Sequence, residues 1–406
     1  MFEINNNVVV VKGAKNAAIY NFNDENVYSI DDTAYSIIYR VLIKRENPAS
    51  DIETNYLTQL KRNGLIDDSF QCREYKVECD YSINLKFAWL ELTQSCNYNC
   101  LHCYEGDVHC SSKNELTLLD WKRVLNQLWE AGCKKIQFTG GEPCLSPYLK
   151  DLLNYASKIG FEDITVFTNA SLLNDELINV FYNSNVRVRF SLYGHCREVH
   201  DAITQHNGSF DKTIANVKKM IDRKIDLYPS VIILKENELY IKEIKDFIES
   251  LGLEYKGYDV IRPACYGNQS THMPTIPEVV YSKHQLYAHF KASKEHFDRA
   301  LSQNTCWYGK IAIDSFGNVF PCVFQRTMSY GNISTHSIKD ILFSPELSQG
   351  WSCDFSKVES CKDCEFRFAC KDCRPLAMVA TNNKFGKNPR CMYNPYLGEW
   401  ENPFNK

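Results

Sequence analysis

The sequence predicts an α/β protein built on a partial barrel of six β/α units, flanked by a small α+β module and a cysteine-rich region. Strand-like and helix-like segments alternate between about residues 84 and 263. Two β-rich runs precede short helices in residues 1–83, and closely spaced cysteines dominate residues 306–406. Residues 264–305 are expected to form a linker or bridging region. A closed barrel of eight units would need more residues than the alternating region supplies.

The composition is that of an ordinary globular chain. It has 406 residues, 44% hydrophobic and 24% charged, with a formal net charge of −4. This charge predicts no nucleic-acid or membrane partner. No secretory signal opens the sequence and no apolar run approaches the length of a membrane helix, so a cytoplasmic location is expected. Eighteen cysteines in such a chain favour metal or cluster ligation over disulfides.

Residues 1–83 have the element order of a winged helix-turn-helix. Strands are expected around Gly13 and the Asn23-Asp24 turn, and helices in DTAYSIIYRVLIKR and in IETNYLTQLKRNG, which ends at Gly64. DNA binding is the ordinary function of such a module. However, it holds nine Lys and Arg against thirteen Asp and Glu, a net of −4, and DNA-binding faces need cationic charge. Recognition of a peptide at a sheet edge fits the module better.

The strands of the central region are followed by the segments that carry chemistry. Thr117 and Asp120 offer a TxxD cap for the helix after the first strand. In such sheets the functional site lies at the carboxyl ends of the strands, and CNYNCLHC follows the first strand directly. The six expected strands are LKFAWLELT, KKIQFTG, ITVFTNA, VRVRFSLYG, YPSVIILK and YKGYDVIRP.

Cys96, Cys100 and Cys103 form a CxxxCxxC pattern with no fourth partner nearby. Three thiolates could hold zinc, but structural zinc sites use four protein ligands. They could also hold a [4Fe–4S] cluster with one iron left open, and the missing fourth cysteine favours this interpretation. CNYNCLHCY resembles the signature of radical S-adenosylmethionine (SAM) enzymes. In that family the open iron binds SAM, and reductive cleavage yields a 5′-deoxyadenosyl radical.

Three further segments resemble the SAM-binding motifs of the same family in order and position. KKIQFTGGEP carries a GGEP motif after the second strand, where glycines permit close backbone approach and a carboxylate can accept the SAM amine. VFTNASLL and SLYG resemble the third- and fourth-strand segments, for which strand-end capping is the alternative. The resemblance implies SAM contacts from Gly140, Gly141, Glu142, Pro143, Thr168, Asn169 and Ser191.

The C-terminal cysteines resemble a SPASM cluster domain. A zinc ribbon is the alternative, since two CxxC pairs alone would suggest zinc. The resemblance implies two auxiliary [4Fe–4S] clusters besides the SAM-binding one, three in all. Cys370 and Cys373 are spaced x2 rather than the commoner x3, and the inner cluster has three clear ligands. Cys353 is a candidate fourth ligand, and an iron open to a substrate thiolate is the other choice. The implied ligands are Cys361, Cys364, Cys370 and Cys391 for the outer cluster and Cys306, Cys322 and Cys373 for the inner one.

The complete architecture resembles radical SAM/SPASM maturases of ribosomally synthesised peptides, closest to the grasp-with-spasm maturases. The resemblance implies a precursor peptide whose leader is gripped by the N-terminal module, and hydrogen abstraction from its core to form a thioether or other crosslink. It also implies an electron donor such as flavodoxin or ferredoxin and an ATP-grasp partner enzyme. The alternatives are a formylglycine-forming anaerobic sulfatase maturase and a non-enzymatic leader-binding scaffold. The candidates for a catalytic role at the barrel mouth are Cys110, Cys265 and Asp259.

Overall fold

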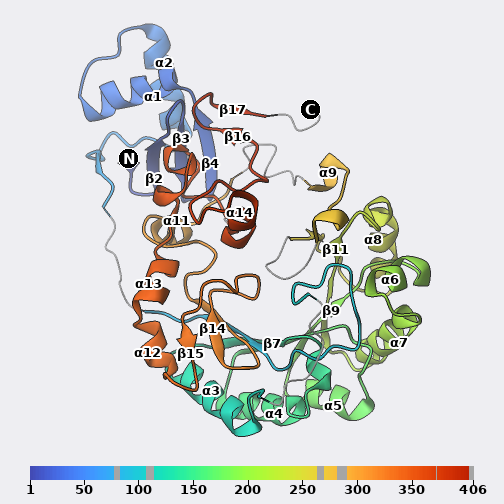
Figure 1. Cartoon of the computed structure of the whole chain (residues 1–406). Coiled ribbons are helices and arrows are strands. Elements are labelled where there is room, and N and C mark those ends of the chain that lie inside the picture. Colours follow the sequence, from blue (N-terminus) through green and yellow to red (C-terminus); the bar gives the residue numbers. More distant parts are fainter. Residues whose placement is uncertain (77–82, 107–113, 263–268, 281–289, 372, 402–406) are drawn as a thin grey trace. The chain divides into compact units, whose positions relative to one another are not determined.

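The computed structural model of the chain is drawn in Figure 1. Its residues form two compact units. The four parts predicted from the sequence are consecutive stretches of the chain. Each of the two units, by contrast, combines stretches that are far apart in the sequence. The first unit comprises Met1–Tyr81, Tyr281–Tyr308 and Trp351–Lys406, and the second comprises Ser82–Val280 and Gly309–Gly350. The structure describes residues 1–76, 83–106, 114–262, 269–280, 290–371 and 373–401.

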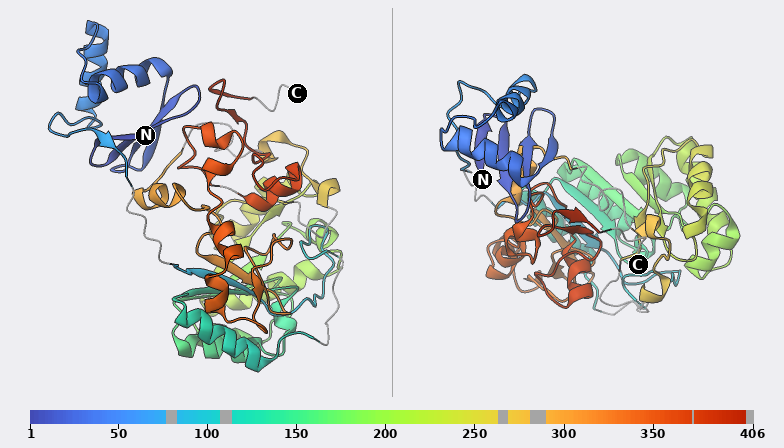
Figure 2. Two further views of the ribbon diagram at one scale, coloured as in Figure 1. Left: turned by 60° about the vertical axis from the view of Figure 1, so that its left-hand side comes forward. Right: turned by 90° about the horizontal axis from the view of Figure 1, so that it is seen from above.

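The first unit contains a five-stranded antiparallel sheet in the order β4-β3-β2-β1-β5. Alternate residues of β2 point to opposite faces, so Val8 and Val10 pack toward two helices, including Leu57 of the second. These helices lie on one side of the sheet (Figure 2). The elements are β1 Phe2–Asn5, β2 Val8–Lys12, β3 Ala17–Asn21, β4 Asn26–Ile30, α1 Asp32–Ile38, a π-helical turn Tyr39–Ile43, α2 Asp51–Arg62 and β5 Arg73–Glu74.

The other face of this sheet forms one core with the cysteine-rich segment. Val9 and Tyr20 pack with Phe297 and Phe366, and the Tyr20 hydroxyl donates a hydrogen bond of 2.8 Å to the Glu365 carbonyl oxygen. The N-terminal module is therefore a structural part of the unit that holds most of the C-terminal cysteines. The remaining elements of this unit are α11 Lys294–Ala300, short 3₁₀ turns Phe355–Lys357 and Cys361–Asp363, α14 Arg374–Thr381, β16 Tyr393–Asn394 and β17 Glu399–Trp400.

Replacing Phe297 by alanine is expected to destabilise this unit strongly. Its ring is fully buried, 4.8 Å from the Tyr20 ring and 5.1 Å from the Phe368 ring. Phe→Ala in such a core costs about 3–5 kcal/mol through lost burial and the cavity left behind. Denaturant unfolding measures the loss, with Phe343→Ala as the control, because Phe343 is 69% exposed. A loss for Phe297→Ala no larger than for the control would contradict this core.

The second unit contains an eight-stranded sheet in the order β10-β9-β8-β7-β6-β13-β14-β15. Each strand from β6 to β10 pairs in parallel with the next, and β13 pairs in parallel with β6. The described residues of this unit form ten strands, of which β11 and β12 lie outside the eight-stranded sheet: β6 Phe87–Glu91, β7 Lys135–Thr139, β8 Asp163–Thr168, β9 Arg187–Ser191, β10 Asp226–Ser230, β11 Ile232–Ile233, β12 Asp259–Val260, β13 Lys310–Ile313, β14 Asn318–Phe320 and β15 Gly331–Asn332.

The two ends of the predicted strand series differ from a simple six-stranded sheet. The sixth predicted strand, β12, pairs with β11 in a separate two-stranded sheet instead of joining the main one. At the opposite edge, β13 and the antiparallel strands β14 and β15 extend the sheet beyond β6. These strands have two to four residues each, too short for a periodic pattern to reveal them.

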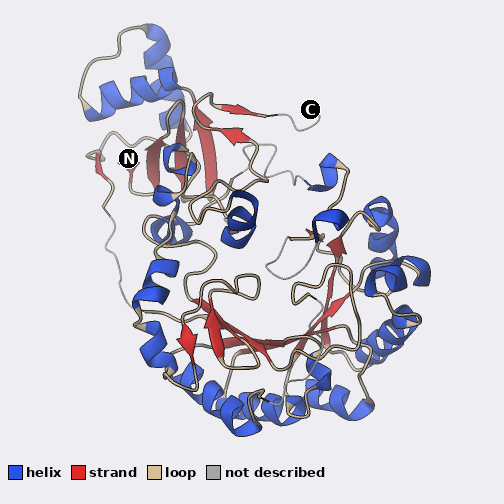
Figure 3. Cartoon of the chain, in the orientation of Figure 1, coloured by secondary structure: helices blue, strands red, loops and turns tan. Residues whose placement is uncertain are grey.

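Helices follow most of the barrel strands and lie along the outer side of the curved sheet (Figure 3). The predicted capping box is present, since Thr117 and Asp120 each accept from the backbone of the other. No helix in the described ranges is long and apolar enough to cross a membrane. The helices are α3 Leu118–Glu130, α4 Leu149–Ile159, α5 Asp175–Asn183, α6 Arg197–Thr204, α7 Ser209–Asp222, α8 Ile241–Ser250, α9 Pro277–Val280, α12 Ile338–Leu342 and α13 Pro345–Trp351, with 3₁₀ turns Pro143–Leu145, Glu238–Tyr240 and Gln269–His272.

Candidate active site

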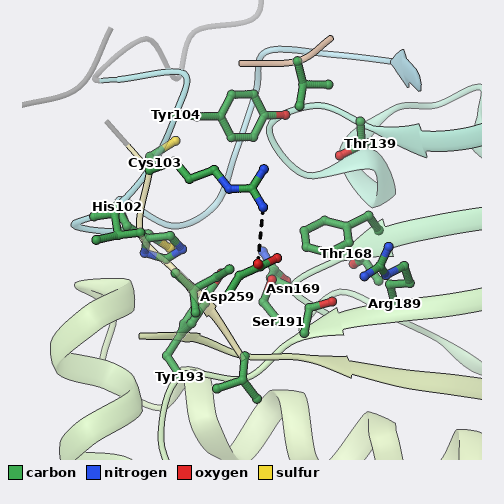
Figure 4. A pocket seen from close by; sticks show the side chains of 18 of the residues that line it. His102, Cys103, Tyr104, Thr139, Thr168, Asn169, Arg189, Ser191, Tyr193 and Asp259 are labelled. Atoms are coloured by element: carbon green, nitrogen blue, oxygen red, sulfur yellow. Dashed lines mark hydrogen bonds and ion pairs between the residues drawn. The ribbon is translucent and has the colours of Figure 1, made fainter. Parts of the chain in front are cut away.

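A cavity of about 450 Å³ opens at the carboxyl ends of the strands in the second unit (Figure 4). This volume suits a cofactor or a segment of substrate. Pro143 is buried at the start of a 3₁₀ turn beside the cavity wall. The other residues predicted to bind the SAM-site cluster or SAM, together with Asp259, line the cavity: Cys96, Cys100, Cys103, Gly140, Gly141, Glu142, Thr168, Asn169, Ser191 and Asp259.

The two glycines of GGEP bring the end of β7 against the backbone that leads into the cysteine loop. The Gly141 amide donates to the Thr93 carbonyl oxygen at 2.8 Å, and the Glu142 amide donates to the Ser95 carbonyl oxygen at 2.7 Å. A Cβ atom at Gly140 would stand 2.4 Å from the Thr93 oxygen, and one at Gly141 would stand 2.3 Å from the Ser95 oxygen. The glycines are therefore needed for this backbone contact, which fixes the entry to the cysteine loop.

Glu142 is the polar centre of the GGEP segment, with 1% of its surface exposed. Its carboxylate accepts from the Thr168 hydroxyl at 2.6 Å, from the Asn169 amide at 2.8 Å and from the Cys144 amide at 3.0 Å. Burial raises the pKa of Glu142, while these hydrogen bonds act in the opposite direction. The carboxylate thus joins the ends of β7 and β8, a role that the motif alone did not reveal.

Asn169 links the third strand to the cysteine loop itself. Its side-chain amide donates to the Asn97 oxygen at 2.9 Å, and Asn97 in turn donates to the Ser171 hydroxyl at 2.9 Å. The loop backbone is also bound to α6, where the Leu101 amide donates to the Ile203 carbonyl oxygen at 3.0 Å. Three elements therefore hold the loop between Cys96 and Cys103 against the cavity.

The three half-buried thiols of the loop line the cavity. Burial raises the pKa of Cys96 and Cys100, and it raises the pKa of Cys103 to about 11. In the described part of the chain, no three His, Cys, Asp or Glu side chains stand close enough to hold a metal ion without rearrangement. The donor set fits an iron–sulfur cluster in its chemistry, because three thiols share one wall and the loop supplies no fourth cysteine.

Of the three candidates for a catalytic role, the structure describes only Asp259. Asp259 lines the cavity at the start of β12 and forms an ion pair of 3.2 Å with Arg262 (Figure 4). The carboxylate is therefore available at the barrel mouth but already partnered. Cys110 and Cys265 lie outside the described residues.

A second polar cluster is buried behind the cysteine loop and was not predicted. Both oxygens of Glu91 accept from the Arg326 guanidinium at 2.6 Å, and the same nitrogen binds Glu105. Tyr104 donates to Glu91 at 3.0 Å. Burial is the main cause that raises the pKa of Glu91 to about 8; the Arg326 guanidinium acts against this shift, and the Glu105 carboxylate adds to it.

This cluster predicts that stability falls as pH rises from about 4.5 to about 8. The folded protein holds a proton on Glu91 that the unfolded chain has released, so raising the pH across this window favours unfolding. We expect a loss on the order of 2 kcal/mol between about pH 6 and about pH 9. Urea unfolding at both pH values measures it. Glu91→Gln should remove most of this pH dependence, and an unchanged dependence in that variant would refute the assignment.

The cysteines predicted for the outer cluster lie in the first unit. Burial raises the pKa of Cys364, and the charges of Cys361 and Cys391 add to this shift. Cys364 and Cys391 also pack against the core that contains Tyr20. Burial raises the pKa of Tyr20, and the charges of Cys364 and Cys370 raise it further. All four predicted ligands therefore lie near this core.

The inner-cluster cysteines are divided between the units. Asn304 bonds the Cys306 amide at 2.9 Å and the Cys353 carbonyl oxygen at 2.8 Å, which brings these two segments together. Cys373 directly precedes α14 in the same unit, whereas Cys322 follows β14 in the second unit. Asn304 therefore links the backbone at Cys306 to the backbone at Cys353.

Comparison with known proteins identifies both domains. Residues 90–248 match the radical SAM superfamily, and residues 306–365 match the SPASM iron–sulfur cluster-binding domain. The chain is therefore a radical SAM enzyme that carries a SPASM domain, as the cysteine motifs predicted. Enzymes of this class use SAM together with iron–sulfur clusters.

Relatives and solved structures extend the likeness beyond the motifs. The antilisterial bacteriocin subtilosin biosynthesis protein AlbA of Bacillus subtilis is 26% identical over 75% of this chain and 70% of its own length. The AdoMet-dependent heme synthase of Methanosarcina barkeri is 25% identical over 76% of this chain and 96% of its own. The crystal structure of Streptococcus suis SuiB superposes with a TM-score of 0.61 at 15% identity, covering 96% of this chain and all of its own. Native anSMEcpe with bound AdoMet gives 0.56 at 15% identity, covering 77% and 93%. The two structures establish a common fold.

Proposed function

We propose that this enzyme modifies a ribosomally synthesised precursor peptide and forms a thioether or another crosslink, as a member of the grasp-with-spasm group. The observation that carries the proposal is the single cavity that gathers the three loop thiols and the GGEP segment. AlbA, a bacteriocin biosynthesis protein, supports a peptide substrate. So does the SuiB structure bound to precursor peptide SuiA, which covers 97% of this chain.

The residues of this chain would bind and orient SAM. Cys96, Cys100 and Cys103 would hold a [4Fe–4S] cluster that, when bound, supplies the electron for cleaving SAM to a 5′-deoxyadenosyl radical. Glu142 retains accepting capacity toward the cavity and would hold the SAM amine, because each carboxylate oxygen has two lone pairs. Ser191 lines the same wall and would contact SAM.

Two auxiliary clusters would complete a set of three. Their ligands in this proposal are those implied by the SPASM resemblance, with Cys353 as the fourth ligand of the inner cluster. An open iron in place of Cys353 would bind a substrate thiolate and direct the product toward a thioether. When bound, the auxiliary clusters would supply an acceptor for the electron that is released as the new bond forms. An electron donor such as flavodoxin or ferredoxin and an ATP-grasp partner enzyme would act with this chain in the cytoplasm.

The proposal assigns roles along the chain in four parts. Residues 1–83 would form a winged-helix-like leader-binding module, 84–263 the six-unit partial barrel, 264–305 a bridging region and 306–406 the auxiliary-cluster domain. The leader would add as a strand to the β4 edge of the N-terminal sheet. Part of this edge is already used, since the Val27 amide donates to the Phe290 carbonyl oxygen at 3.2 Å. Along a β-strand the backbone amides point alternately to one side and to the other. The Ser29 amide, two residues after Val27, therefore also points outward.

Ser29→Pro tests this edge without breaking the pairing of β4 with β3. It removes an outward donor that β3 does not use, whereas Ser29→Ala keeps the donor and loses only the exposed hydroxyl. Leader binding should weaken about tenfold in the proline variant, the worth of one or two lost hydrogen bonds, and stay unchanged in the alanine variant. Equal binding by both variants would place the leader elsewhere.

The proposed function itself is tested with the reconstituted, reduced enzyme, SAM and a short peptide encoded beside its gene. Crosslinking should lower the peptide mass by two hydrogen atoms and produce one 5′-deoxyadenosine for each bond formed. The leader-free core should react far more slowly. Release of 5′-deoxyadenosine with no change in any peptide mass would reject a peptide substrate.

Formylglycine formation is the second candidate, because Asp259 places a carboxylate at the barrel mouth. The same assay distinguishes it. A product aldehyde that reacts with hydrazines would support this alternative, whereas a crosslinked product without an aldehyde supports the maturase.

A further inference from the structure

Two arginines on one face of β9 have opposite surroundings. Arg187, at the start of the strand, forms ion pairs with Asp163 at 2.8 Å and with Asp226 at 2.7 Å. Arg189, two residues later on the same face, has no ion pair or hydrogen bond among the described residues, and its buried Nε atom has no acceptor. Two neighbouring acids neutralise the first guanidinium, and none neutralises the second.

Aromatic rings on the adjacent strands hold the Arg189 guanidinium. It lies 4.7 Å from the Tyr228 ring centre and 6.0 Å from that of Phe167, the residues paired with it on β10 and β8. Such rings stabilise a cation and fix its plane, but they accept no strong hydrogen bond. The guanidinium is therefore held in position, and its N–H groups have no hydrogen-bond acceptor among the described residues.

Arg189 forms part of the wall of the active-site cavity, beside Ser191 (Figure 4). The one lysine and the other arginine in that wall have acidic partners, Lys256 with Glu254 and Arg262 with Asp259, each at 3.2 Å. Arg189 thus offers the cavity a cation that no acid of the described chain compensates. A partly buried guanidinium without a counter-ion is costly, and its planar fork matches a carboxylate.

Two ligands could supply a carboxylate here, the methionyl group of SAM and an acidic side chain of the substrate. Arg189 lies two residues before the end of β9, about 7 Å deeper along the strand than Ser191. Glu142, Thr168 and Asn169, by contrast, stand at the strand ends beside the cysteine loop. SAM would bind at the strand ends beside the cysteine loop. A carboxylate that reaches the deeper Arg189 is therefore better supplied by the substrate than by SAM.

We propose that Arg189 binds the carboxylate of an aspartate or glutamate in the core peptide and makes the cavity selective for an acidic residue beside the site of modification. This inference rests on the proposed peptide substrate. Arg189 is a binding and specificity residue here, and the chemical step does not pass through it.

The test measures binding rather than turnover. Two tritiated heptapeptides that differ only in a central Glu or Gln are dialysed to equilibrium against the reconstituted holoenzyme with SAM. The Glu peptide should bind about tenfold more tightly, the worth of a charge-assisted bidentate pair. Arg189→Gln should abolish this preference, and Arg189→Lys should keep part of it. Arg187→Gln is the matched control and should leave it unchanged. Thermal melting confirms that each variant is folded.

Each other result overturns the proposal. Equal binding of the two peptides by the wild type, or a preference that survives in Arg189→Gln, excludes recognition of a side-chain carboxylate by Arg189. A fall in SAM affinity in Arg189→Gln without any peptide preference in the wild type would assign the carboxylate to the cofactor. Because no turnover is needed, failure of the proposed crosslinking activity would appear separately, in the peptide-mass assay.

Discussion

Replacing Cys96, Cys100 and Cys103 together by alanine is expected to lower the iron content from about twelve to about eight per chain. The loop supplies three thiols to one cavity wall, and three elements hold its backbone there. A [4Fe–4S] cluster at this loop would be held by the three cysteines as thiolates, so the variant would lose every loop ligand of that cluster. Iron and acid-labile sulfide are counted on protein prepared without oxygen.

Cys133→Ala is the matched control for this experiment. Cys133 is buried and its thiol donates to the Lys135 carbonyl oxygen at 3.3 Å, away from the cavity, so iron should stay near twelve. Zinc in place of iron, or an iron count that the triple variant leaves unchanged, would mean that the loop holds no cluster.

Replacing Glu142 by alanine should both destabilise the second unit and abolish tight SAM binding. The substitution leaves two backbone amides and the Thr168 hydroxyl without their acceptor in a buried place. Each buried unsatisfied donor costs about 1–3 kcal/mol, so a total loss of about 3–5 kcal/mol is expected. Loss of a charged acceptor for the SAM amine should weaken SAM binding about a hundredfold.

Thermal melting and equilibrium dialysis with SAM separate the two effects. Glu162→Ala, at an exposed position before β8, is the control and should change neither quantity. A Glu142→Ala protein with normal melting and normal SAM affinity would show that neither the network nor the assigned contact matters.

Local sequence pattern was enough to single out many of the residues that line the cavity. The CxxxCxxC spacing, the GGEP segment and the strand ends at Thr168 and Ser191 are contiguous signals, and parallel strands bring their carboxyl ends to one edge. The Thr117 cap was equally local. The reason for the glycines was only partly visible, because their close contact is with the backbone of another loop.

Long-range features escaped prediction for a physical reason. The pairing of β13 with β6 joins segments more than two hundred residues apart, and no periodicity records such a partner. The hydrogen bond between Asn97 and Asn169 and the Arg326 cluster arise in the same way from tertiary contact. Arg189 had a readable signal, since RVRFS places polar residues on one face of a strand that ends at Ser191, but its lack of a counter-ion needed the structure.

The most direct test of the account is whether the reduced, iron-loaded protein cleaves SAM to 5′-deoxyadenosine and methionine. We predict product with the wild type and dithionite, and none without a reductant. The triple cysteine variant should form at least a thousandfold less product, a loss in which each factor of ten corresponds to about 1.4 kcal/mol of barrier. A wild-type protein with its full iron content that forms no 5′-deoxyadenosine under these conditions would contradict the assignment as a radical SAM enzyme.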